Sequence, residues 1–112
     1  MLLDYKLKKR GIRPETIPGY EREATTHLAV ALAVKTGEAD AGMCVYSAAK
    51  ALGLRFVPVA DERYELVVRR EHLDDHRIKA LFEAVGSPSF RSRLELLGGY
   101  DTTITGVTRE LP

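Results

Sequence analysis

The stretch "ATTHLAVALAVKTGEADAGMCVYSAAKALGLRFVPVA" (residues 24–60) decides the expected fold, because helix and strand patterns alternate along it. Its clearest helix runs from Ala24 to Lys35 and ends at Gly37. A short buried strand, a second helix that begins with Ser47 as its N-cap, and a second strand follow it; these elements are expected over residues 39–46, 47–53 and 54–60. Such alternation is typical of an α/β domain.

The flanking segments continue this pattern. Residues 63–70 predict another strand, and two amphipathic helices are expected after it, over residues 74–87 and 87–99. Ser87 is the expected N-cap of the last helix, with Pro88 in its first turn. A short helix is expected before Gly11, and the tail after residue 99 is polar and rich in turns.

The composition indicates a globular chain without a strong charge preference. Its 112 residues suit one domain or part of one, and 45% are hydrophobic while 29% are charged. A net charge of +1 favours neither nucleic acid nor a membrane surface. The longest apolar run is too short to span a bilayer, and the first residues do not form a signal peptide. We therefore expect a cytoplasmic protein.

Two threonines and a histidine stand where the clearest helix should begin. The simplest interpretation is that Thr25 or Thr26 caps the helix with its hydroxyl group. A second interpretation adds function: the first N–H groups of a helix lack internal partners, so Thr25, Thr26 and His27 could complete an anion site there. His27 has no second histidine one turn away, which argues against a metal site.

Other candidate chemistry is weaker. His72 and His76 have a metal-like spacing, but the aspartates between them indicate a helix start, and a solvated charged face is the simpler interpretation. The lone Cys44 is expected to be a small buried hydrophobe, and neither it nor His27 has a charged partner that would activate a nucleophile. Tyr46 is either an exposed hydroxyl donor or a packed aromatic residue. No phosphate-binding loop is present. We expect no enzyme, cofactor or metal ion.

The order of these features resembles the periplasmic-binding-protein-like domain of molybdate-related transcriptional regulators and molybdopterin-biosynthesis-associated proteins. Three stretches carry the resemblance: "GYERE.TTH.AVA.AV..G.ADAG", "AAKALGL.FVPVA.ERY.LVV" and "F...L..L.GYDT..TG". The chain is more distantly similar to the molybdate-binding proteins of ABC transporters. The resemblance implies a partial type II periplasmic-binding-protein-like fold that corresponds to the C-terminal half of the family domain.

The resemblance also implies how the chain is divided. Residues 1–56 would belong to a second lobe, residues 57–60 would form a hinge strand, and residues 61–112 would return to the first lobe and end in terminal helices. Oxyanion-binding relatives hold their ligand with helix N-termini, hydroxyl groups and a tyrosine. By this resemblance the ligand-binding residues would be Thr25, Thr26, His27, Tyr46 and Ser47.

The expected function is therefore a non-enzymatic module for a small oxyanion, such as molybdate or tungstate, or for a small polar metabolite, with a sensing or regulatory role. The alternative is a regulatory or oligomerisation module that needs a partner chain to complete its fold. That alternative predicts a homodimer, because the strand over residues 64–68 would present an unpaired edge. Direct binding of nucleic acid is not expected.

Overall fold

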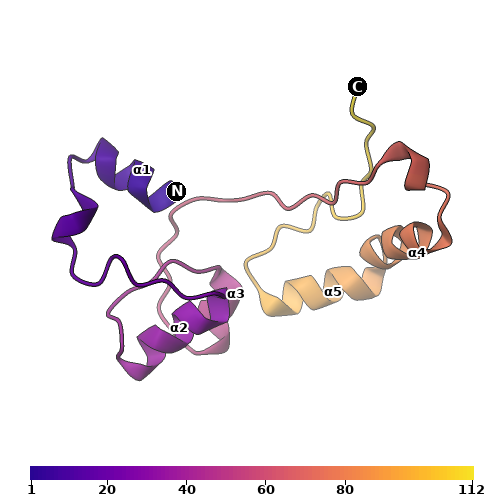
Figure 1. Ribbon diagram of the computed structural model, residues 1–112. Coiled ribbons are helices and arrows are strands. Elements are labelled where there is room, and N and C mark those ends of the chain that lie inside the picture. Colours follow the sequence, from indigo (N-terminus) through magenta and orange to yellow (C-terminus); the bar gives the residue numbers. More distant parts are fainter. The chain divides into compact units, whose positions relative to one another are not determined.

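The computed structural model describes residues 1–112 and contains helices but no strand (Figure 1). Five helices are α-helical and two are short 3₁₀ helices. In chain order they are α1 (Leu2–Lys9), η1 (Pro14–Thr16), α2 (His27–Thr36), α3 (Tyr46–Ala51), η2 (Arg70–His72), α4 (His76–Val85) and α5 (Pro88–Leu97).

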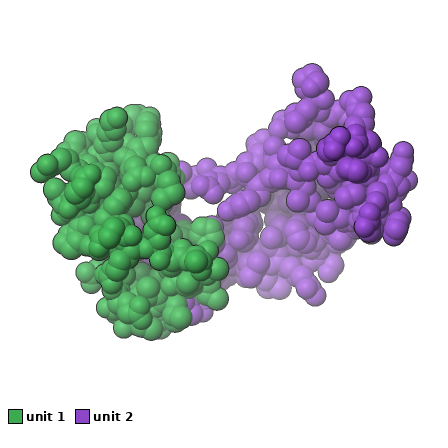
Figure 2. Space-filling view, viewed as in Figure 1, with its two compact units in different colours: residues 1–44 green, residues 45–112 purple.

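The chain divides into two compact units, residues 1–44 and residues 45–112 (Figure 2). The first unit holds α1, η1 and α2, and the second unit holds the remaining helices. Within the second unit, α5 contacts both α3 and α4. The expected division into residues 1–56, 57–60 and 61–112 stays a prediction.

Local chemistry explains where the helices begin and end. The side chain of Thr26 caps α2, and Gly37 ends that helix in the left-handed conformation with φ 83°. Ser87 caps α5 by accepting the N–H of Phe90, and Pro88 is its first residue. These expected caps are confirmed. The expected cap at Ser47 is wrong, because the N-cap of α3 is Val45 and Ser47 lies inside the helix.

The expected α/β fold, a partial type II periplasmic-binding-protein-like fold with a hinge strand, is also wrong. None of residues 39–46, 54–60 and 63–70 forms a strand. Apolar and β-branched residues favour extended backbone, but a strand exists only where its N–H and C=O groups pair with a neighbour. From residue 55 to residue 68 no backbone N–H or C=O group makes a hydrogen bond within the chain. The apolar pattern predicted strands, but these residues have no partner strand within the chain.

The core is small. Only Ala31, Ala48 and Ala49 are buried, while 18 large hydrophobic side chains are exposed. The accessible surface is 9779 Å², whereas two separately folded units of these sizes would together expose only about 7,400 Å². Much apolar surface therefore has no partner inside the chain. No helix has both the length and the apolar character needed to cross a membrane.

Candidate functional site

The start of α2 brings three of the predicted site residues together. Thr26 has extended backbone, and its Oγ1 accepts the N–H of Ala29 at 3.0 Å. Its carbonyl oxygen accepts the N–H of Val30 at 3.1 Å. Thr26 is thus the N-cap, and its hydroxyl satisfies the third N–H group of the helix.

The remaining groups at this helix start stay open. The N–H groups of His27 and Leu28 are the first two of the helix and have no intrahelical acceptor. The side chains of Thr25 and His27 are exposed, and no acidic residue lies in the first turn. The positive end of the helix dipole is therefore not neutralised by a neighbouring carboxylate in that turn. Two N–H donors, a hydroxyl group and an imidazole ring face solvent together.

Tyr46 and Ser47 lie at the start of α3, in the second unit. The ring of Tyr46 packs edge-on against Phe56, with 5.3 Å between ring centroids and 82° between ring planes. Tyr46 is still 40% exposed, which fits a packed aromatic residue with a wet tip. The Oγ of Ser47 lies 3.1 Å from the Oη of Tyr100. Tyr46 thus contacts a residue ten positions along the chain, and Ser47 contacts a residue 53 positions along.

A pair of glycines lets the chain pass close to α3. A Cβ atom on Gly99 would lie 2.7 Å from the Cβ and Cδ1 of Tyr46, and Gly99 has φ +80°. A Cβ atom on Gly98 would lie 3.0 Å from the Nζ of Lys50, and this Nζ donates to the carbonyl oxygen of Leu96 at 3.2 Å. Only glycine combines this backbone conformation with such a close approach.

The contact between Tyr100 and Ser47 was missed by sequence reasoning. Tyr100 lies within the stretch "GYDT" and Ser47 directly follows Tyr46, so the shared motif of the resemblance was the available signal. The residues after Tyr100 are held by their own side chains: the carboxylate of Asp101 accepts the N–H and the hydroxyl of Thr103 at 2.9 and 2.5 Å. The Thr103 hydroxyl and N–H lower the pKa of Asp101. The loop therefore contacts α3 through Tyr100 and is hydrogen-bonded within itself through Asp101.

The five predicted residues thus form two groups. Thr25, Thr26 and His27 belong to residues 1–44, and Tyr46 and Ser47 belong to residues 45–112.

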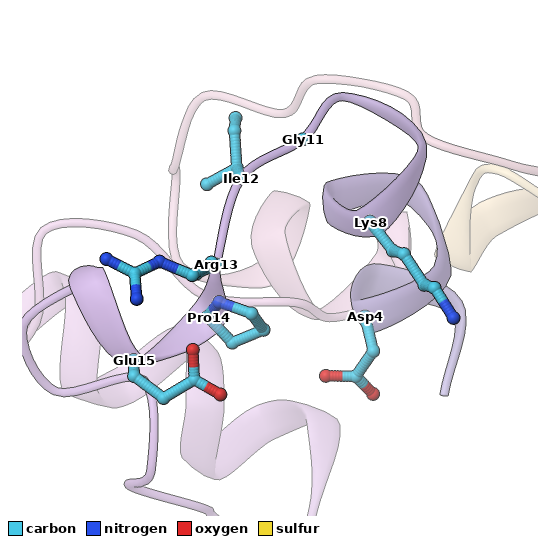
Figure 3. Close-up of a pocket in the computed structure, with 7 residues that line it drawn as sticks. All are labelled: Asp4, Lys8, Gly11, Ile12, Arg13, Pro14 and Glu15. Atoms are coloured by element: carbon cyan, nitrogen blue, oxygen red, sulfur yellow. The ribbon is translucent and has the colours of Figure 1, made fainter.

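The first unit also carries an open depression of about 420 Å³ between α1 and η1 (Figure 3). Its lining residues are Asp4, Lys8, Gly11, Ile12, Arg13, Pro14 and Glu15. The ammonium group of Lys8 and the guanidinium group of Arg13 point away from each other, so they do not converge on one ligand. Sequence reasoning did not single out this region.

One carboxylate of the depression is already engaged. Asp4 accepts a hydrogen bond from the hydroxyl of Tyr20, and its Oδ2 lies 3.0 Å from the N-terminal amine. The Tyr20 hydroxyl, followed by the N-terminal amine, lowers the pKa of Asp4, and the same hydrogen bond raises the pKa of Tyr20 to about 12. These contacts fasten the segment around Tyr20 to α1 and suit a structural role.

The histidines and the cysteine do not form a site in this structure. His72 lies in η2 and His76 is the first residue of α4, as the acidic pair before it predicted. No group of three or more His, Cys, Asp or Glu side chains has the geometry to hold a metal ion. Cys44 is a half-buried free thiol, more accessible than the buried hydrophobe that was expected.

Comparison with known proteins gives a family match and two relatives. The PBP superfamily domain (PBP_like) matches residues 1–86. The chain is 40% identical over 111 residues to an uncharacterized protein in the ferredoxin 2Fe-2S gene 5′ region of Clostridium pasteurianum, with 95% of each chain covered. It is 36% identical over 106 residues to the uncharacterized protein YvgK of Bacillus subtilis (strain 168); this covers 95% of the present chain but only 34% of YvgK. No solved structure matches.

Proposed function

Because this chain belongs to the PBP-like family, whose domain matches residues 1–86, we propose that it is a non-enzymatic module that binds a small oxyanion and has a sensing or regulatory role. Molybdate and tungstate are the preferred ligands, and a small polar metabolite is the other option. The observation that carries the proposal is the open start of α2, with its unpaired N–H groups, Thr25 hydroxyl and His27 imidazole.

The groups at this helix start are hydrogen-bond donors, so they suit an anion that carries no proton and only accepts hydrogen bonds. Two N–H groups at the positive end of a helix provide hydrogen bonds and a partial positive charge. The Thr25 hydroxyl adds a rotatable donor, and the imidazole of His27 adds a donor in either protonation state. Since Thr26 is occupied in capping the helix, its contribution is to hold the first turn in place.

The start of α4 offers a matched control within the same chain. His76 is also the first residue of its helix, and its side chain is 93% exposed, but the N-cap there is the carboxylate of Asp75. A carboxylate at this position repels an anion and takes up the N–H group that the anion would need. An anion should therefore select the start of α2 over the start of α4.

Titration calorimetry with sodium molybdate and sodium tungstate tests the proposal. Replacing Thr25→Val or His27→Gln should each weaken binding about tenfold, the value of one hydrogen bond to a charged group. His76→Gln should leave binding unchanged. Absence of heat and of any thermal shift with the native chain would contradict the proposal, and so would equal losses for His27→Gln and His76→Gln.

The resemblance also assigns Tyr46 and Ser47 to the ligand. Their hydroxyl groups lie at the start of α3, and the Ser47 hydroxyl is held by Tyr100. Ser47→Ala is expected to weaken molybdate binding, while Ser89→Ala, on the exposed face of α5, should not. An unchanged affinity in Ser47→Ala would restrict the proposed site to the start of α2.

A second candidate function is a regulatory or oligomerisation module that needs a partner chain. The observation that favours it is the exposure of 18 large hydrophobic side chains around a core of three alanines. Such a surface is larger and more apolar than a folded monomer normally leaves uncovered.

Chemical unfolding at several protein concentrations tests this second candidate. A chain that is stabilised by a partner should show a transition midpoint that rises with concentration if the partner is a second copy, and no cooperative transition if the partner is a different protein. A cooperative transition with the same midpoint at every concentration would contradict the need for a partner.

A further inference from the structure

Residues 55–68 combine two unusual properties. Their backbone N–H and C=O groups make no hydrogen bond within the chain. Four of their large apolar side chains are also exposed: Val57 to 73%, Tyr64 to 70%, Leu66 to 59% and Val67 to 82%. Backbone groups can be satisfied by water, but apolar side chains gain nothing from it. A segment with both properties fits another extended chain laid alongside it.

We propose that residues 65–69, "ELVVR", pair in antiparallel orientation with the same residues of a second copy, about a two-fold axis through Val67. This rests on the second proposed function, the need for a partner chain, and names that partner and its contact surface. The contact is isologous, so that each copy contributes the same residues.

The sequence of this segment is complementary to itself in this register. Glu65 of one copy lies opposite Arg69 of the other, Leu66 lies opposite Val68, and Val67 meets Val67 on the axis. In an antiparallel pair, residues directly opposite each other lie on the same face of the sheet, and side chains alternate between the faces along each strand. Opposite residues of two identical copies must therefore be an even number of positions apart in the sequence. This places the two-fold axis at a residue and not between two neighbouring residues.

The registers with an axis on the N-terminal side of Val67 are worse. An axis through Glu65 would place the two Glu65 carboxylates opposite each other, and an axis through Leu66 would place Arg63 opposite Arg69. Like charges directly opposite are destabilising, so the axis at Val67 is selected by charge as well as by apolar contact.

The present partners of the two charged ends do not prevent this pairing. Glu65 accepts from Arg109 at 3.0 Å, and Arg69 lies 2.7 Å from Glu71. These side chains are about half to three-quarters exposed, and surface ion pairs of this kind are weak and readily exchanged. Arg69 already has extended backbone, with φ −66° and ψ 139°, and η2 begins at the next residue and ends the segment.

The exposed surface of the chain is large enough to be covered by a second copy. The exposed surface of 9779 Å² exceeds that of two folded units of these sizes by about 2,400 Å² per chain, and obligate homodimers bury about 2,000–5,000 Å² in total. A net charge of +1 gives two copies little mutual repulsion.

Charge reversal with light scattering tests the pairing. The native chain should have the mass of two 12.5 kDa chains. Glu65→Arg and Arg69→Glu should each weaken dimerisation at least tenfold, roughly the effect of two opposed like-charge pairs, and the double variant should restore it. Arg109→Ala, which removes only the internal partner of Glu65, should leave the dimer intact. A monomeric native chain, or a double variant no better than the single ones, would overturn the proposal.

Cysteine cross-linking locates the axis even if a charge variant folds poorly. In a Cys44→Ser background, Val67→Cys should form an intermolecular disulfide on mild oxidation, because opposite residues of an antiparallel pair lie within disulfide reach. Val57→Cys, on another exposed valine that lies outside residues 65–69, should not. Equal cross-linking of both would overturn the proposed contact, while a concentration-dependent unfolding midpoint would still uphold the need for a partner.

Discussion

Helices α2 and α4 have the same length and the same first residue, yet their starts differ in charge. Each helix has ten residues and begins with a histidine. Two threonines, Thr25 and Thr26, precede the first helix, and two aspartates, Asp74 and Asp75, precede the second. Both helices are capped by the side chain just before the histidine. Both pairs provide a capping side chain. Only the threonine pair does so without a negative charge that would repel an anion.

The carboxylate of Asp75 shows how the start of α4 is satisfied internally. It accepts the backbone N–H of Arg77 at 2.8 Å and two bonds from the guanidinium group of Arg77 at 3.1 and 2.7 Å. The guanidinium and backbone hydrogen bonds from Arg77 lower the pKa of Asp75. The hydroxyl of Thr26 instead accepts a single N–H at the start of α2. A capped helix start can therefore carry a carboxylate, as in α4, or have a neutral cap, as in α2.

The two helices also differ in the glycine that lies against them, and this difference gives the largest predicted effect. Gly106, with φ +84°, lies beside the end of α4, where an added Cβ would be 2.7 Å from the Cα of Gly86. Gly42 lies beside α2, where an added Cβ would be 2.5 Å from a methyl group of Val30. A valine side chain can rotate, but a backbone atom cannot.

Gly106→Ala should therefore destabilise the chain by about 3 kcal/mol, as left-handed strain and backbone overlap add together. Gly42→Ala should cost about 1 kcal/mol. Urea unfolding at one fixed protein concentration measures both. Gly37→Ala is a useful control, because Gly37 has φ +83° but open space around it, so its cost isolates the backbone strain. A smaller loss for Gly106→Ala than for Gly37→Ala would contradict this account.

Converting the start of α2 into that of α4 should give the next largest effect. Thr25→Asp/Thr26→Asp keeps good capping residues but adds two negative charges where the oxyanion is proposed to bind. Molybdate affinity should fall at least about tenfold, which corresponds to about 1.4 kcal/mol. Circular dichroism should show unchanged helix content. Thr25→Asn/Thr26→Asn is the neutral control and should bind molybdate more tightly than the aspartate variant; equal losses in the two variants would refute the electrostatic explanation.

Removing the cap of α2 without adding charge should have a smaller effect. Thr26→Ala deletes the hydroxyl that accepts the N–H of Ala29 and should destabilise the chain by about 1 kcal/mol. Thr26→Ser keeps the acceptor and should recover most of this loss. Thr36→Ala, in the last turn of the same helix, is a control for general tolerance of alanine. Equal stability of the alanine and serine variants would show that the cap contributes nothing.

The helix starts could be predicted from single residues because capping is a local interaction. Thr26, Ser87 and Gly37 act within three or four residues of where they stand, so the sequence alone places Ser87 and Gly37 and narrows the cap of α2 to Thr25 or Thr26. Ser47 was misplaced because α3 begins two residues earlier, on a Val45 cap without a side-chain hydrogen bond. There the contact with the Gly98–Tyr100 segment, distant in sequence, holds the helix start.

The α/β expectation was wrong for a related reason. Residues such as Val57, Tyr64 and Val67 have the composition of strands, but composition does not state where the partner strand lies. The predicted strands have no such partner within this chain. Likewise, sequence could group Thr25, Thr26 and His27 because they are adjacent, but it could not find the contact of Ser47 with Tyr100 across 53 positions.

The smallest predicted effect is a difference in acid sensitivity between the two helix starts. The folded-state pKa of Asp75 lies below its ordinary value of 3.8, so its contribution to α4 is fully present above that value and is lost as the pH falls through the lower folded pKa. The hydroxyl cap of α2 does not titrate. Residue-resolved Cα chemical shifts should therefore show the first turn of α4 loosening before that of α2 as the pH falls below the ordinary carboxyl pKa of 3.8. Asp75→Asn, a cap without a titrating group, should abolish the difference, and an unchanged pH profile in this variant would assign the loosening to other carboxylates.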